Sequence, residues 1–189
     1  MTETFTVLFV CSANQCRSAM AEAIADDELA RQAGAGKVGL EFVSAGTHAL
    51  AGSPATNGTI AVLRDRGIDL GRHRSRELDA GVLAGADLVL AMTAEHTVTI
   101  LAWERSASRR TFTLAAFARA VERAGRSAES ADELVDLANE HLQELDADDV
   151  ADPVGQGEEA YQACVERIDG LVRPLVRALA KAAQPSRAR

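Results

Sequence analysis

The sequence predicts an α/β protein: a single domain of three layers (α/β/α), with a central four-stranded parallel sheet between helices. Segments rich in apolar and β-branched residues alternate with segments of helical periodicity, which favours parallel strands joined by helical crossovers. The first apolar segment is almost free of polar residues, as in a strand covered on both faces. A length of 189 residues fits one domain with a substantial core.

The first half of the chain alternates regularly between the two patterns. Thr4–Val10 is predicted as a strand, and helical spacing begins at Arg17 and stops at a pair of glycines after residue 33. Leu40–Ser44 is predicted as a second strand. A helix is expected over Pro54–Arg66, with the proline in its first turn and a glycine just past its end.

The second half continues the alternation. Further strands are predicted over Ala86–Met92 and Arg110–Thr113. Helices are predicted over Thr93–Ser106, over Leu114–Ala124 and from Glu158 to Ala183. The four predicted strands would therefore be joined by helices, as a parallel sheet requires.

An acidic segment interrupts this pattern before the last helix. We expect the domain to span residues 1–183, with an acidic helical insertion at about 118–150 and a basic tail at 184–189. Apolar residues recur in the insertion at the spacing of an amphipathic surface helix. They are Leu134, Leu137, Ala138, Leu142 and Leu145.

Composition excludes several classes of function. A net charge of −8 argues against a nucleic-acid partner, because phosphate backbones are bound by clustered Lys and Arg. Membrane insertion is not expected, since no apolar run approaches the ~20 residues of a membrane span. The N-terminus does not resemble a signal peptide, and three cysteines suit a reducing compartment, so a cytoplasmic location is expected.

The loop after the first strand, CSANQCRS, is the strongest functional signal. It leads from a buried strand into a helix, where backbone N–H groups and the helix dipole can bind one anion. The residues expected to line this phosphate site are Ser12, Ala13, Asn14, Gln15, Cys16, Arg17 and Ser18. Cys11 is the candidate nucleophile, because helix N–H groups and a nearby cation stabilise a thiolate. Arg17 can bind two phosphate oxygens with its planar guanidinium, and Ser18 can donate its hydroxyl to the sulfur.

Cleavage of a phosphate ester by a thiolate also needs an acid that protonates the leaving group. Asp152 is the candidate, because it precedes Pro153 in a glycine-containing loop that fits a rigid turn. Asp146, Asp148 and Asp149 are rivals by spacing alone.

The C-x5-R-S pattern after an N-terminal strand resembles the low-molecular-weight protein-tyrosine phosphatases, a family whose bacterial members include protein-arginine phosphatases. Further matching motifs extend over nearly the whole chain. They are Ser44-Ala45-Gly46-Thr47, Pro54-Ala55, Gly67-Ile68-Asp69-Leu70, His73-Arg74-Ser75, Ala86-Asp87, Met92 and Asp152-Pro153.

The resemblance implies a metal-independent phosphatase without a cofactor, which works through a phosphocysteine at Cys11 with Asp152 as general acid. It implies phosphorylated proteins as substrates, and phosphate, sulfate, vanadate or other oxyanions as ligands of the loop. It also implies an unusual backbone conformation at Asn14, supported by Ser44 and His73. Cys16 is expected either to form a reversible disulfide with Cys11, as the resemblance implies, or to fill space as a buried thiol, and Cys164 is expected in the core.

Three departures from the family pattern leave the substrate open. Aromatic residues that often flank the cleft in this family are absent after Gly46 and after Pro153. Within the loop, Gln15 and Ala13 differ from the residues that the family commonly has at these positions. Hydrolysis of phosphotyrosine is the main hypothesis, and hydrolysis of phosphoarginine on the same scaffold is the alternative. A thiol-coupled arsenate reductase is disfavoured because the segment around residues 80–92 lacks cysteine. A non-catalytic phosphate-binding module is the remaining hypothesis.

Overall fold

The computed structural model describes residues 4–32, 39–124, 128, 130–141 and 148–183. Its centre is a sheet of four parallel strands in the order β2-β1-β3-β4. The strands are β1 (Phe5–Cys11), β2 (Leu40–Gly46), β3 (Leu88–Ala91) and β4 (Thr111–Thr113). The α/β class and the four-stranded parallel sheet are thus as predicted, although β2 extends two residues further, to Gly46.

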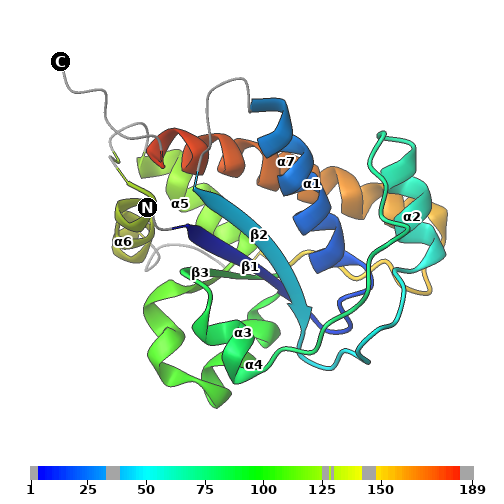
Figure 1. Cartoon of the computed structure of the whole chain (residues 1–189), viewed down its shortest axis with the longest axis horizontal. Coiled ribbons are helices and arrows are strands. Elements are labelled where there is room, and N and C mark those ends of the chain that lie inside the picture. The colour runs from blue at the N-terminus through cyan, green and yellow to red at the C-terminus, as the bar shows by residue number, and fades with distance from the viewer. Residues whose placement is uncertain (1–3, 33–38, 125–127, 129, 142–147, 184–189) are drawn as a thin grey trace.

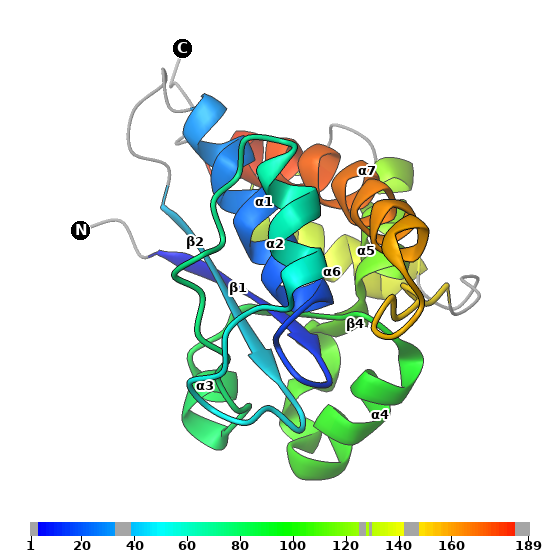
Figure 2. The same ribbon diagram turned by 90° about the vertical axis from the view of Figure 1, so that its right-hand side faces the viewer.

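Helices cover both faces of the sheet (Figures 1 and 2). One face carries α1 (Arg17–Gln32), α2 (Asn57–Arg64), α5 (Leu114–Ala124), α6 (Ala131–His141) and α7 (Glu158–Ala182). The other face carries α3 (Ala80–Ala84) and α4 (Ala94–Trp103). Alternate side chains of β1 explain the two layers: Val7 and Phe9 join the first core, whereas Leu8 and Val10 join the second.

Two helix predictions need correction, and one short helix was not predicted. Helix α2 begins at Asn57 and not at Pro54, because the Thr56 side chain caps its N-terminus by accepting from Thr59 N. Helix α4 ends at Trp103, and a separate 3-10 segment covers Arg105–Arg110. The five-residue helix α3 was not predicted, since one turn is too short to show a helical period.

The acidic segment is part of the fold. Leu134, Val135 and Ala138 of α6 are buried in the same core as α1 and α7, which explains the helical spacing of its apolar residues. Leu142 and Leu145 of the same pattern lie outside the described residues, as does the tail at 184–189. No helix in the described part of the chain is long and apolar enough to span a membrane.

An ion-pair network joins α1 to α7. The buried carboxylate of Glu28 accepts from Arg173 at 3.0 Å and from Arg177 at 2.6 Å. Burial alone would raise the pKa of Glu28, but these two guanidinium groups outweigh it and lower the pKa. The charged network fixes how α7, the helix that follows the Asp152 loop, lies on α1.

Candidate active site

The loop from Cys11 to Ser18 lies at the carboxyl end of β1, where parallel α/β sheets bind ligands. Strand β1 ends at Cys11 and α1 begins at Arg17, so the loop amides and the first turn of the helix lie together. Cys11 is 3% exposed, and its Sγ lies 3.0 Å from Ser18 Oγ. The nucleophile candidate therefore has a hydroxyl partner.

Asn14 holds the loop in its curve. It is the described non-glycine residue with positive φ, 53°, a left-handed conformation that asparagine tolerates. Its Nδ2 donates to Ser18 Oγ at 2.9 Å and to Ser44 Oγ at 2.7 Å, while its carbonyl oxygen lies 2.6 Å from His73 Nε2. Ser44 and His73 therefore lie against Asn14, at the positions that the family resemblance implies.

Arg76, which belongs to a basic stretch with His73, completes the set of groups around Asn14. Its backbone N–H donates to Asn14 Oδ1 at 2.8 Å, and its guanidinium donates to the Ser44 carbonyl. Sequence motifs identify residues by their side chains, so they do not reveal that the backbone N–H of Arg76 binds the Asn14 side chain. Both polar atoms of the Asn14 amide are thus bound.

Gly46, the last residue of β2, lets the loop approach the sheet. A Cβ at this position would lie 2.5 Å from the Ser12 carbonyl oxygen and 2.8 Å from Asn14 N, well inside contact distance. Thr47 N and His48 N continue the contact by donating to the carbonyls of Cys11 and Ser12, each at 2.9 Å. The loop is therefore built directly against the end of β2.

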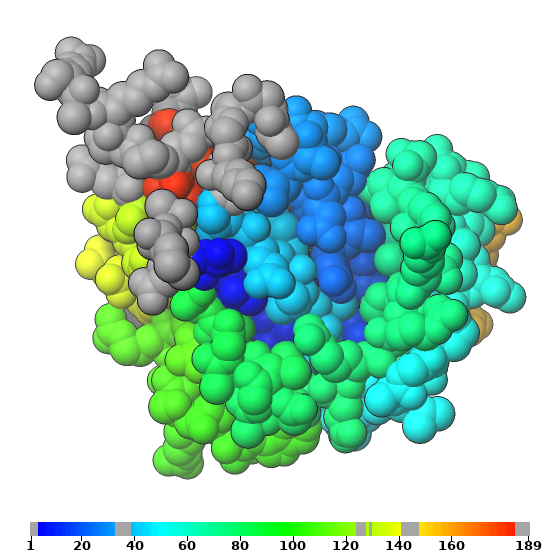
Figure 3. Space-filling model, viewed as in Figure 1, coloured from blue at the N-terminus to red at the C-terminus, as the bar shows by residue number. Residues whose placement is uncertain are grey.

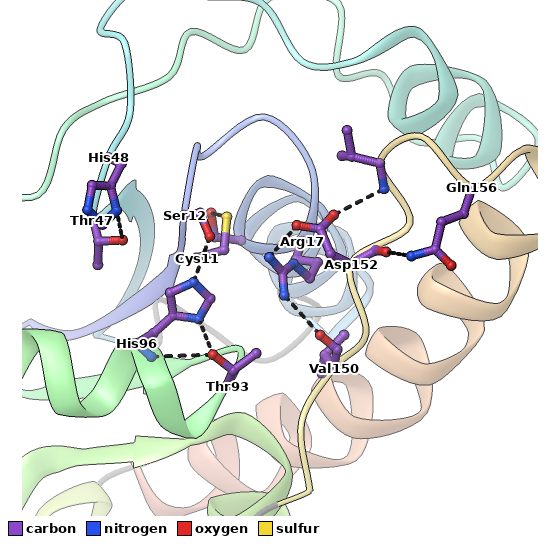
Figure 4. A network of polar contacts seen from close by, with 12 residues as sticks. Cys11, Ser12, Arg17, Thr47, His48, Thr93, His96, Val150, Asp152 and Gln156 are labelled. Atoms are coloured by element: carbon purple, nitrogen blue, oxygen red, sulfur yellow. Dashed lines mark hydrogen bonds and ion pairs between the residues drawn. The ribbon is translucent and has the colours of Figure 1, made fainter.

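Arg17 and Asp152 form an ion pair across the site, 135 residues apart in sequence. The Arg17 side chain is 5% exposed and donates through Nη2 to Asp152 Oδ2 at 2.5 Å and through Nη1 to the Val150 carbonyl at 3.0 Å (Figure 4). Val150 N in turn donates to the Met92 carbonyl at 2.8 Å, which ties the segment to the end of β3. Asp152 is 46% exposed and thus open to solvent.

The rival acids have structural partners. Asp148 binds Arg119 and Arg167, and Asp149 accepts from Ala94 N at 2.8 Å at the start of α4. Asp146 lies outside the described residues. Of the aspartates that the structure describes in this segment, Asp152 is the one that contacts Arg17.

His96 is a buried residue of the site that the sequence analysis missed. Its Nε2 lies 2.9 Å from Ser12 Oγ and its Nδ1 lies 2.7 Å from Thr93 Oγ1 (Figure 4). Burial lowers the pKa of His96, and the positive charge of Arg17 lowers it further. A single histidine in the first turn of a helix is no motif, so only the folded chain brings it to the loop.

Cys16 and Cys164 pack against each other beneath the loop. Both are free thiols and 5% exposed, and a hydrogen bond with Cys164, together with burial, raises the pKa of Cys16. Cys164 thus lies in the core, as expected. The structure has all three cysteines as thiols, so the proposed Cys11–Cys16 disulfide stays a prediction.

The two segments where aromatics were noted as absent each carry an exposed aliphatic residue. Leu50 is 76% exposed and Val154 is 54% exposed. The ring of Tyr161 packs against Gly58, and its hydroxyl accepts from Thr56 at 3.2 Å, so it supports α2. Among the residues with described positions, no group of three or more His, Cys, Asp or Glu could hold a metal ion.

Comparisons with known proteins agree with this geometry. The family model of low molecular weight phosphotyrosine protein phosphatase matches residues 6–129. The chain is 38% identical over 87 residues to a probable low molecular weight protein-tyrosine-phosphatase, EpsP, from Ralstonia nicotianae. That match covers 46% of this chain and 54% of the relative, so the chain spans about half the relative's length.

Other similarities extend over almost the whole chain. A protein-arginine-phosphatase from Geobacillus stearothermophilus is 30% identical over 93% of this chain and 96% of its own length. The solved structure of the YwlE arginine phosphatase from that organism is 31% identical, with a TM-score of 0.72 over 93% of this chain and 92% of its own. A solved low molecular weight protein tyrosine phosphatase from T. tengcongensis is 33% identical. Its TM-score is 0.69, over 92% of this chain and 99% of its own.

The family match covers well over half of the 189 residues, and it includes the loop, β2 and β3 that build the site. The similarity to the Geobacillus relative continues beyond it into α7. The chain therefore belongs to the low molecular weight phosphotyrosine protein phosphatase family.

Proposed function

We propose that the protein is a cysteine-dependent, metal-independent phosphatase that acts on phosphorylated proteins in the cytoplasm. The observation that carries the proposal is the convergence of Cys11, Arg17 and Asp152 at the carboxyl end of the sheet, although Asp152 is 135 residues from Arg17. The triad offers a nucleophile, a cation for the phosphoryl oxygens and an acid for the leaving group.

In the first step, the Cys11 thiolate attacks phosphorus and forms an S–P bond. The bond between phosphorus and the leaving group breaks, and protonated Asp152 gives its proton to that group. The Arg17 guanidinium and the loop N–H groups bind the equatorial oxygens, where charge is concentrated. Arg17 would exchange Asp152 for phosphate oxygens as the substrate enters.

In the second step, water attacks the phosphocysteine. Asp152, now a carboxylate, takes a proton from that water, the S–P bond breaks, and inorganic phosphate and the Cys11 thiolate are released. Ser18 Oγ, 3.0 Å from Cys11 Sγ, can donate a hydrogen bond to the leaving thiolate. The cycle needs no oxidant and no further reactant.

Phosphoarginine is the better supported substrate, which corrects the preference for phosphotyrosine drawn from the sequence. The arginine phosphatase from Geobacillus is similar over nearly the full length of both chains. The segments that often carry aromatic residues beside the cleft in this family have the exposed aliphatic residues Leu50 and Val154 instead, so a phosphotyrosine ring would lack those stacking partners. Phosphotyrosine remains the second candidate, because the low molecular weight protein tyrosine phosphatase from T. tengcongensis is also similar over most of this chain.

The test uses paired peptides that carry phosphoarginine or phosphotyrosine at the same position. Phosphate release should continue in excess chelator, be inhibited by vanadate and be lost in Cys11→Ser. A higher kcat/KM for the phosphoarginine peptide is expected, and the reverse order would restore phosphotyrosine as the substrate. Turnover that survives Cys11→Ser would refute the phosphocysteine mechanism, whereas anion binding without any turnover would indicate a phosphate-binding module.

A further inference from the structure

His96 links the phosphate loop to α4. No other hydrogen bond described above connects these two elements. It lies in the first turn of α4, is 6% exposed, and contacts Ser12 Oγ in the phosphate loop and Thr93 Oγ1 at the N-cap of α4. Figure 4 shows the imidazole beside Cys11 and Ser12, on the side of the site opposite Asp152. Neither step proposed above uses this buried, titratable ring.

Burial first, and then the charges around the ring, lower the pKa of His96. Arg17 of α1 opposes a positive charge on His96, as does the partial positive charge at the N-terminus of α4. The carboxylates that face it are Glu95 of α4 and, in the segment before α7, Asp149 and Asp152. Neither ring nitrogen has a carboxylate as its hydrogen-bond partner, because both partners are hydroxyls.

We propose, on the basis of the phosphatase function above, that His96 is a positioning residue that takes up a proton when a dianion binds the loop. It then becomes a second cation beside Arg17 and orients Ser12. The geometry carries this proposal: Ser12 follows the nucleophile directly, and its hydroxyl is 2.9 Å from the imidazole. The negative charge of a dianion held by the loop would offset the burial and the Arg17 charge that favour a neutral ring.

Protonation has a defined consequence for the hydrogen bonds. A neutral imidazole has one donor and one acceptor nitrogen, so Ser12 can be either donor or acceptor toward Nε2. An imidazolium donates from both nitrogens, so the hydroxyl oxygens of Ser12 and Thr93 must both accept. The Ser12 hydroxyl proton is then free to donate to an oxygen of the bound anion.

The experiment follows the imidazole Cε1–H resonance of His96 in the full chain by NMR between pH 4.5 and 8, with and without sulfate. Sulfate stays a dianion over this range and takes up no proton itself. We expect a pKa below the usual 6.5 without sulfate and a rise of about one unit or more with it. By reciprocity, sulfate should bind about tenfold more tightly to the protonated form.

His96→Gln is the matched variant, because its amide can still donate to Ser12 but cannot take up a proton. The resonance that is lost in this variant is that of His96. In the variant, the affinity for sulfate should no longer rise about tenfold as the pH falls through the pKa of His96. Ser12→Ala should weaken sulfate binding at low pH and leave it nearly unchanged at high pH. These results would separate a proton-linked role from support of the fold.

Two outcomes would overturn the inference in different ways. If sulfate binds but the pKa of His96 stays unchanged, or His96→Gln keeps the full pH dependence, the inference is wrong and the proposed phosphatase function stands. If sulfate does not bind the loop at any pH, the anion site itself is refuted and both proposals fail.

Discussion

At the scale of single residues, the site depends on two positions that let the phosphate loop lie close to the sheet. Gly46 leaves space for the carbonyl oxygen of Ser12, and Asn14 supplies a left-handed turn that most residues would strain to adopt. Neither residue carries the proposed chemistry. Both determine where Cys11 lies relative to Arg17, and a displacement of about 1 Å can cost a hundredfold in rate.

Gly46→Ala tests this dependence. The new methyl group would clash with the backbone of residues 12–14, so we expect kcat/KM to fall at least about tenfold and the free energy of unfolding to fall by about 1–3 kcal/mol. Gly170→Ala in α7 is the control, because its Cβ would meet nothing within 4 Å. The control should keep full activity and gain about 0.5–1 kcal/mol of stability. Unchanged activity in Gly46→Ala would contradict the role assigned to close packing.

At the scale of elements, α1 begins in the phosphate loop and also lines a groove along its side. The groove has a volume of about 480 Å³ and lies between α1 and residues 67–73, the turquoise segment beside the blue helix in Figure 3. Four carboxylates line it, from Glu22, Asp26, Asp27 and Asp69. Partial burial and, to a smaller extent, the nearby charges of Glu22 and Glu41 together raise the pKa of Asp26 to about 6.

This shift predicts how stability changes with pH. The folded protein holds the Asp26 proton up to about pH 6, whereas the unfolded chain releases it near pH 4, so the charged carboxylate destabilises the fold at neutral pH. Asp26→Asn should therefore raise the unfolding free energy at pH 7.5 by about 1 kcal/mol, after allowance for solvent screening. The gain should vanish near pH 4, and thermal melts over this range measure it. An equal gain at both pH values would show that Asp26 does not titrate as described.

The elements also show what periodicity can and cannot predict. All four strands and the long helices follow from apolar spacing, because their buried faces are long enough to repeat. Helix α3 and the early end of α4 could not be predicted, since one turn has no period and the 3-10 segment at 105–110 continues a helical pattern. Cys11, Arg17 and Asp152 were found through motifs, whereas His96 and Arg76 act only through tertiary contacts.

At the scale of the whole molecule, the site is where distant segments are tied together. The loop contacts Thr47 and His48 just after β2, α4 through His96, and the segment before α7 through Arg17. That segment is in turn bound to the end of β3. An anion held by the loop and Arg17 would therefore brace both layers of helices against one end of the sheet.

An oxyanion should consequently stabilise the entire domain and not the loop alone. A ligand that binds only the folded state at 100 times its Kd adds about 2.7 kcal/mol, or about 5–10 °C in Tm for a chain of this size. Phosphate or vanadate should produce such a rise in wild type and in Cys11→Ser, which retains Arg17 and the loop amides. Arg17→Lys should lose most of the rise, because an ammonium cannot replace the guanidinium that binds two oxygens and also donates to Val150. Differential scanning fluorimetry measures all three proteins together, and an equal rise in Arg17→Lys would place the anion away from this loop.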